Sequence, residues 1–223
     1  MLSTLLVIFA PFIFLIENGY HLYSSLTGSP GIAILLTSAT FSIAVFPLQR
    51  WSKRFESKIA LRLKAATEDI SKLDKGLKGE ARFNEIEKIY VKNEYHPIHS
   101  IALGLSFFVT IPFLIASLLL FNQSDILAGA QFLFIQDLQM PDGTLSLGSL
   151  SINILPLMLF IFTFLDAMVR YKDNRSIMHR FMFVSVVLTF LVYSMPAGLL
   201  LYWIGANLMS FIIYWVSTSL AAK

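Results

Sequence analysis

The chain has 223 residues, of which 56% are hydrophobic and 14% are charged, and its mean hydropathy is +0.69. Soluble domains are usually about 45–50% apolar and about 25% charged, so this composition excludes an ordinary soluble domain and indicates a single membrane domain. The chain contains no cysteine, which excludes disulfides, thiolate metal sites and cysteine nucleophiles.

The basic residues are confined to three places. Of the 17 Lys and Arg residues, twelve lie between Arg50 and Lys92, four lie between Arg170 and Arg180, and Lys223 is the last. Loops rich in Lys and Arg stay on the cytoplasmic side of a bilayer. The distribution therefore predicts a multi-pass membrane protein with both basic loops and the C-terminus in the cytoplasm. We interpret the basic residues as serving topology and headgroup contact, not nucleic-acid binding.

The N-terminal segment from Leu2 to Ile16 is apolar but short for a membrane span, which needs about 20 residues. It has no basic start and no small-residue cleavage site, so it is not typical of a signal peptide. Beyond Pro11, apolar residues recur at helical spacing as far as Leu26. We predict that residues 1–28 form a helix lying in the outer membrane interface, with a short sixth span as the alternative.

Five segments of residues 29–223 are long and apolar enough to cross the membrane. They are residues 31–48, 100–121, 152–169, 177–195 and 197–216. Pro196 and Gly198 separate the last two segments and predict a tight turn between them. The sequence therefore predicts an all-α membrane protein with five transmembrane helices.

Residues 49–99, between the first two spans, are predicted to form a cytoplasmic helical hairpin. Apolar residues recur every three or four positions from Phe55 to Leu73, and again from Phe83 to Tyr90, with glycines between the two stretches. Two antiparallel helices can bury such stripes against each other and leave the charges outside. We expect this hairpin to be mobile relative to the spans. A solvated charged linker is the alternative.

The sequence carries no motif for enzymatic chemistry. HExxH, GxSxG and Walker patterns are absent. Asp166, the one acid within a predicted span, precedes Arg170 by one helical turn, which we interpret as an intrahelical ion pair. His96 and His99 have a metal-like spacing but no third ligand. We therefore expect a protein that is not an enzyme and that has no metal site and no cofactor.

Neutral polar residues recur on three of the predicted spans. Ser38 and Ser42 share a face of the first span, Thr110 lies on the second, and Asn207 lies on the fifth. In hydrocarbon, such residues either bond helices together or line a wet cavity. Polar faces on three separate spans favour a shared hydrophilic groove, and helix–helix bonding is the alternative.

Four short motifs follow one another on this topology. They are Phe46-Pro-Leu48, Ile111-Pro-Phe113, the run from Phe132 to Leu138 followed by Pro141-Asp142, and the run from Pro196 to Asn207. In this order they resemble the YidC–Oxa–Alb family of membrane protein insertases. The resemblance covers the chain from about Pro11 to Trp215.

The resemblance implies a groove that is open to the cytoplasm and to lipid, closed toward the outside, and entered by a nascent membrane segment. Its partners would be nascent or small membrane proteins and the lipid bilayer, and its location the bacterial plasma (inner) membrane. The implied groove residues are Ser38, Ser42, Thr110, Trp203 and Asn207. The residues implied at the cytoplasmic mouth are Arg50, Lys53 and Arg54.

Two departures from the family qualify this function. Ser42 stands where the family has a groove arginine, so we expect substrates with short, weakly charged translocated segments. Only Ala221-Ala-Lys223 follows the last span, so we expect ribosome docking to be weak or absent. The alternative function is a structural or assembly subunit of a larger membrane complex that keeps the fold without inserting. Ser42 favours the subunit, whereas the intact loop and fifth-span motifs favour the insertase.

Overall fold

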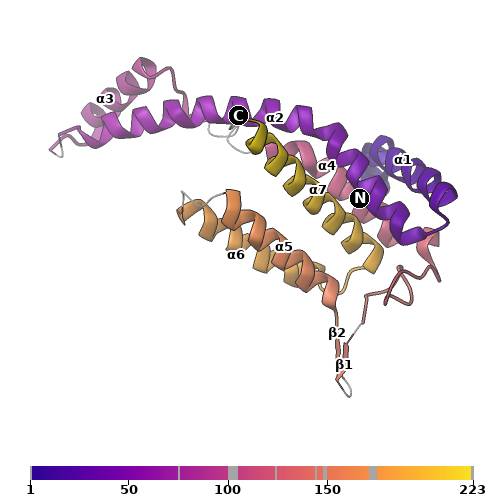
Figure 1. The fold of residues 1–223 in the computed structure, drawn as a ribbon. Helices are drawn as coiled ribbons and strands as arrows, with labels where there is room; N and C mark the ends of the chain where they lie inside the picture. Colours follow the sequence, from indigo (N-terminus) through magenta and orange to yellow (C-terminus); the bar gives the residue numbers. More distant parts are fainter. Residues whose placement is uncertain are drawn as a thin grey trace. The chain divides into compact units, whose positions relative to one another are not determined.

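The computed structural model describes residues 2–74, 76–99, 105–123, 125–143, 145–147, 150–170 and 175–221. Within these ranges seven α-helices and one small β-hairpin follow one another along the chain (Figure 1). The chain divides into two compact units. The membrane unit comprises Met1–Ala44 and Pro112–Lys223, and the hairpin unit comprises Val45–Ile111.

The first helix, α1, is longer than the apolar N-terminal segment. It runs from Leu2 to Thr27 and passes through Pro11 without a break. Gly28 ends it in the left-handed conformation, with φ at +65°, and its N–H donates to the carbonyl of Ser24 at 2.9 Å. By length and composition α1 is one of three described helices that could cross a membrane.

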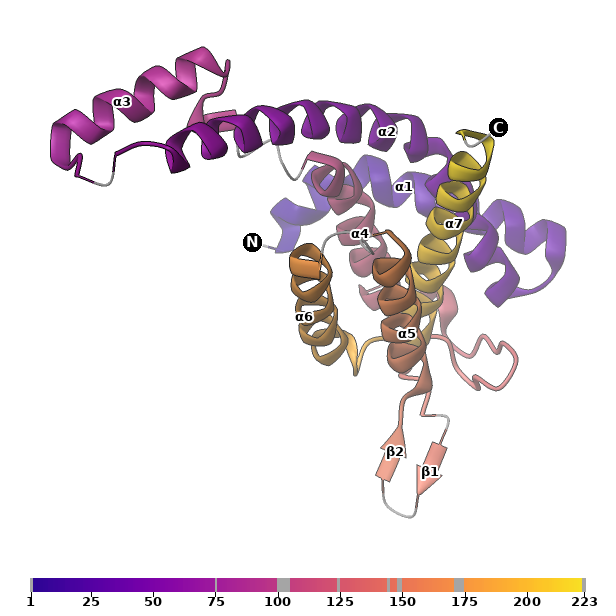
Figure 2. The ribbon, with the colours of Figure 1, turned by 60° about the vertical axis from the view of Figure 1, so that its left-hand side comes forward.

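α1 lies against two other helices of the membrane unit. A Cβ on Gly19 would be 3.1 Å from a methyl group of Thr37, and the ring of Phe12 meets that of Phe113 edge-on, with centroids 5.1 Å apart. Figure 2 shows α1 running across the direction of α5 and α6 and not along it. The interfacial placement of α1 in the membrane stays a prediction.

The second helix, α2, runs from Pro30 to Ser71 and contains both the predicted first span and the start of the predicted hairpin. The predicted boundary between these two parts is Leu48, but the helix continues through Pro47. One proline removes one backbone hydrogen bond. The helical periodicity on both sides of Pro47 is strong enough for the helix to continue across it.

The other predicted spans coincide with helices, and the all-α class is confirmed. The helices are α4 (Leu105–Gln123), α5 (Ile154–Arg170), α6 (Arg175–Val192) and α7 (Ala197–Ala221). The predicted start of the second span at Ser100 lies outside the described residues. α7 and α2 join α1 as candidate spans, whereas α4, α5 and α6 contain shorter apolar stretches. The number of five crossings stays a prediction.

The loop between α4 and α5 carries the only regular strands among the described residues. The strand β1 (Leu145–Leu147) pairs antiparallel with β2 (Leu150–Ile152), and Leu145 faces Ile152 in the register. This hairpin projects from the membrane unit just before α5 (Figure 2).

The core of the membrane unit gathers around the first turns of α7. Leu199 and Leu200 are fully buried there, together with Leu127 and Leu138 of the α4–α5 loop. In contrast, α6 exposes a broad apolar surface, with Phe190 78% exposed. Such a surface suits a helix surrounded by lipid, because lipid tails are as apolar as the side chains they meet.

The hairpin unit pairs the second half of α2 with α3 (Gly79–Lys92). Ile59 and Ala66 are buried, which confirms the predicted stripe on α2. The expectation that Phe55 and Phe83 would be buried with them is wrong, because these side chains are 45% and 65% exposed. The ion pairs and hydrogen bonds to α2 come from Lys92, Asn93 and Glu94, at the C-terminal end of α3 and just beyond it, and involve neither phenylalanine.

Candidate functional site

α2 and α7 of the membrane unit approach each other closely at Ser38. A Cβ on Gly205 would overlap the Ser38 hydroxyl, and Ser38 is only 1% exposed. Its Oγ donates to the carbonyl of Leu35 at 2.8 Å, so the hydroxyl is satisfied within its own helix. Small residues at a helix contact allow the backbones to come close. Ser38 therefore lies in a tight helix contact.

Trp203 links α7 to α4. Its Nε1 donates to Oγ of Ser117 at 3.0 Å, and Ser117 Oγ is 2.9 Å from the carbonyl of Leu114, to which it donates. Both side chains are buried. Ser117 is not among the predicted site residues, because one serine in an apolar helix has no periodic partner to mark it. The bond fixes the Trp203 ring within the core of the membrane unit.

Ser42 and Asn207 lie one turn beyond these buried contacts and are only half-buried. Ser42 Oγ donates to the carbonyl of Ser38 at 2.8 Å, and Asn207 Nδ2 donates to the carbonyl of Trp203 at 2.9 Å. Both residues are therefore partly exposed, on helices that approach each other at Ser38. They are the predicted groove residues best placed to hold water.

The remaining predicted site residues belong to the hairpin unit. Thr110 is half-buried near the start of α4. The mouth residues Arg50, Lys53 and Arg54 are exposed on α2. The structure thus places Ser38 at the α2–α7 contact and Trp203 at a contact between α7 and α4, and the groove as a whole stays a prediction.

Asp142 anchors the start of α5. Its Oδ2 accepts the backbone N–H of Ile154 at 2.6 Å, and its Oδ1 accepts that of Leu155 at 3.3 Å. The carboxylate is buried, at 8% exposure. The first N–H groups of a helix have no partner within the helix, and a negative charge at this end is favourable. The Pro141-Asp142 motif therefore has a structural role.

The α4–α5 loop also pairs with the first turn of α7. The carbonyls of Leu138 and Met140 accept the N–H groups of Gly198 and Ala197 at 2.8 and 2.9 Å. A Cβ on Gly198 would overlap Leu127, so only glycine fits beneath the loop. This explains why the motifs in the loop and at the start of the last helix occur together.

Further contacts close the same end of the membrane unit. Gln139 Nε2 donates to the carbonyl of Phe121 at the end of α4, at 3.1 Å. A Cβ on Gly31, at the start of α2, would overlap the ring of Phe132. The loop therefore ties together the ends of α2, α4, α5 and α7, and it closes this end of the unit.

The hairpin unit is held by side-chain charges. Asp69 on α2 accepts hydrogen bonds from Lys92 Nζ at 2.9 Å and Asn93 Nδ2 at 3.4 Å, and Arg62 pairs with Glu94. The hydrogen bond from Lys92, followed by that from Asn93, holds the pKa of Asp69 below its usual range.

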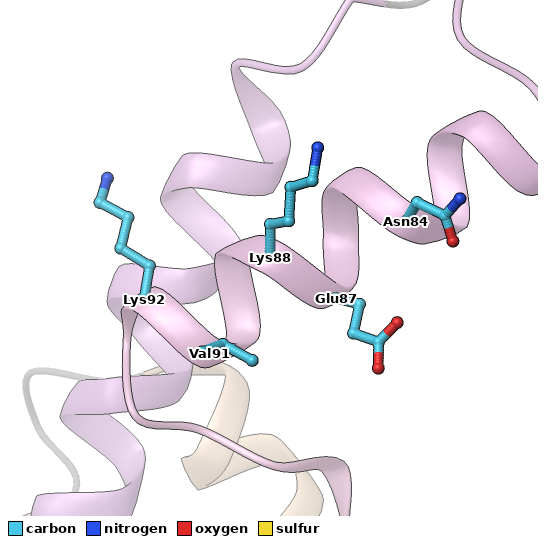
Figure 3. Close-up of a pocket in the computed structure, with 5 residues that line it drawn as sticks. All are labelled: Asn84, Glu87, Lys88, Val91 and Lys92. Carbon is cyan, nitrogen blue, oxygen red and sulfur yellow. The ribbon is translucent and has the colours of Figure 1, made fainter.

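An open hollow of about 650 Å³ lies along α3, lined by Asn84, Glu87, Lys88, Val91 and Lys92. Figure 3 shows Lys88 and Lys92 pointing to one side of the helix and Glu87 to the other. Among the described residues no group of three His, Asp or Glu side chains could hold a metal ion. The hollow is a charged surface of mixed sign.

Comparison with known proteins shows which family and which proteins the chain is similar to. A family model described as "60Kd inner membrane protein" matches residues 22–223. The membrane protein insertase YidC of Chlamydia muridarum (strain MoPn / Nigg) is 29% identical over 95% of this chain, and that of Francisella philomiragia subsp. philomiragia is 28% identical over 96%. The chain spans only 28% and 36% of the length of these two relatives.

A solved structure agrees with these matches. The active YidC insertase crystal structure with its first transmembrane domain resolved matches with a TM-score of 0.50 at 19% identity. The match covers 92% of this chain and 46% of that one, and it shows the fold. The resemblance drawn from the four sequence motifs is confirmed.

Proposed function

This chain belongs to the 60Kd inner membrane protein family, and from that premise we propose that it assists the insertion and folding of membrane proteins through an intramembrane groove. The observation that carries the proposal is the asymmetry of the membrane unit. A buried network closes the end where α7 begins, whereas the polar residues Ser42 and Asn207 are partly exposed one turn beyond the buried contacts.

In the proposed orientation the closed end faces outward, and the hairpin unit and the C-terminus face the cytoplasm of a bacterial plasma (inner) membrane. The clustering of basic residues in two loops supports this orientation. The path of α1 across the direction of α5 and α6 supports its placement in the outer interface. A membrane-impermeant reagent should therefore label a cysteine at position 125 in intact cells, but should not label one at position 64.

In the proposed mechanism the protein lowers the free-energy barrier to moving polar groups across the bilayer, and no covalent chemistry takes place. A polar tail crossing hydrocarbon loses its hydrogen bonds to water, at a cost of several kcal/mol per group. Water held by Ser42 and Asn207 would replace part of that hydration. Buried Ser38 and Trp203 would keep the helices that form the wall in place. The substrates would be nascent or small membrane proteins.

The test is complementation of a cell depleted of its insertase. We expect this chain to insert substrates with short, weakly charged translocated tails. Ser42→Arg should extend the range to acidic tails, because a unit charge about 4 Å from a carboxylate contributes roughly 4 kcal/mol of gross attraction at an effective dielectric near 20. Ser42→Gln, which is long and polar but uncharged, is the control.

Two results would contradict the proposal. Failure to complement, together with stable stoichiometric copurification with another membrane complex, would favour the subunit function. Efficient insertion of acidic tails by the unmodified chain would show that charge at position 42 does not set the substrate range.

A further inference from the structure

Five basic residues of the hairpin unit, all beyond the first turns after the predicted first span, are paired with carboxylates in the unit. They are Arg62, Lys64, Lys72, Lys88 and Lys92. Arg50, Arg54 and Lys58, which follow the span directly, are exposed and have no ion-pair partner among the described residues.

Arg50, Arg54 and Lys58 occupy one face of α2. Their spacing of four residues places them in a row that rises about 12 Å along the helix. Beside this row, Trp51 and Phe55 stack on each other, with ring centroids 6.1 Å apart and planes 10° from parallel. Trp51 is 60% exposed and Phe55 45% exposed. A hydrated cytoplasmic surface gives no reason to expose a stacked aromatic pair.

From this arrangement we propose that residues 50–58 form a binding site for anionic phospholipid headgroups. Exposed Leu48 ends the apolar part of the helix, and Trp51 follows within a rise of about 5 Å, at the depth where aromatic side chains sit in membrane interfaces. Basic side chains next to a membrane end attract anionic lipids. The aromatic pair inserts among the headgroups, and the basic row binds their phosphates.

The geometry favours lipid over an acidic segment of a substrate. A single carboxylate is held by donors that converge on one point, whereas Arg50, Arg54 and Lys58 are spread along the helix. A row of this kind matches several headgroups side by side. The proposal uses the predicted orientation only to name the cytoplasmic leaflet, and it does not depend on insertion activity.

The test uses the full chain in vesicles of phosphatidylcholine with or without phosphatidylglycerol. Trp203→Phe and Trp215→Phe leave Trp51 as the one tryptophan, and its fluorescence is quenched by either lipid in brominated form. We expect phosphatidylglycerol to be enriched around Trp51. The triple variant Arg50→Gln, Arg54→Gln, Lys58→Gln should reduce that enrichment at least about five-fold, which corresponds to roughly 1 kcal/mol for one basic residue.

A matched control removes three paired charges from the same unit, through Lys64→Gln, Lys72→Gln and Lys88→Gln. This control should keep the enrichment. High salt should weaken it in the unmodified chain, because the screening length falls from about 10 Å at 0.1 M to about 3 Å at 1 M. Native mass spectrometry of retained phosphatidylglycerol, on chains that keep all three tryptophans, gives a second readout if the tryptophan variants fail to fold.

Three outcomes would overturn the proposal. The first is equal quenching by the two lipids in the unmodified chain. The second is an equal loss in the triple variant and in the control, which would show an effect of net charge alone. The third is a triple variant that keeps its lipid enrichment but loses cross-linking to an acidic peptide, which would make this row a peptide site. The vesicle assay contains no substrate, and both leaflets have the same composition. Its result therefore does not depend on whether the chain inserts membrane proteins, so loss of the lipid site can be told apart from loss of the insertase function.

Discussion

Each of the two units of this chain is stabilised by a different kind of interaction. In the membrane unit, Asp142 caps a helix, the α4–α5 loop pairs with α7 through backbone hydrogen bonds, and Gly205 admits a close helix contact. In the hairpin unit, Asp69 and Arg62 form charged pairs that water reaches. Buried hydrogen bonds are costly to break, whereas exposed ion pairs contribute little and are screened by salt. The hairpin unit should therefore open before the membrane unit does.

The largest expected effect is in the membrane unit. Asp142→Ala leaves the N–H groups of Ile154 and Leu155 without their acceptor, and loss of such a cap costs about 2 kcal/mol. Thermal unfolding in detergent should show the loss. Asp142→Asn should keep much of the stability, because asparagine also caps helices. Asp125→Ala, at an exposed carboxylate, is the control. If Asp125→Ala lowers the stability as much as Asp142→Ala does, Asp142 does not act as a helix cap.

A smaller effect is expected at the α2–α7 contact. Gly205→Ala places a methyl group where the Ser38 hydroxyl lies and should cost about 1 kcal/mol, because extra atoms strain a packed contact. Ser38→Ala removes the overlapping oxygen, so the double variant should recover part of the loss. Unfolding of both single variants and the double variant measures this coupling. If the losses in free energy of unfolding of the two single variants simply add in the double variant, the two residues do not touch.

The smallest effect is expected in the hairpin unit. Asp69→Asn removes the charge that binds Lys92 and should increase hydrogen exchange in α3, with the membrane unit unchanged. Because the pKa of Asp69 is lower in the folded state, its stabilising effect is complete above the ordinary aspartate value of about 3.9 and is lost as pH falls through the folded pKa. Protection of α3 in the unmodified chain should therefore fall in this acid range, and the variant should lack that step.

Salt provides the control for the Asp69 experiment. Raising the ionic strength should lower the protection of α3 in the unmodified chain and leave that of α5 and α7 unchanged. If α3 keeps full protection in high salt and at low pH, the apolar contacts of Ile59 and Ala66 hold the hairpin unit, and the contrast between the two units is wrong.

The sequence alone determined the class of the protein, because the relevant signals are local. Apolar segments of span length predicted helices where α4, α5, α6 and α7 occur, and the basic clusters marked the loops. The glycines after Leu73 placed the break before α3 correctly. The four motifs were enough to find the family, since each is a short run of residues in a fixed order.

Tertiary structure decided what each polar residue does. Ser38 and Ser42 are equivalent in a helical pattern, but Gly205 of α7 covers only Ser38. The roles of Asp142 and Gly198 depend on contacts between the α4–α5 loop and the starts of α5 and α7, which no local sequence pattern shows. Phe55 and Phe83 fit an apolar stripe, yet both side chains are exposed in the folded chain. Periodicity identifies the face of a helix, but burial depends on which other helix meets that face, and only the folded chain determines that.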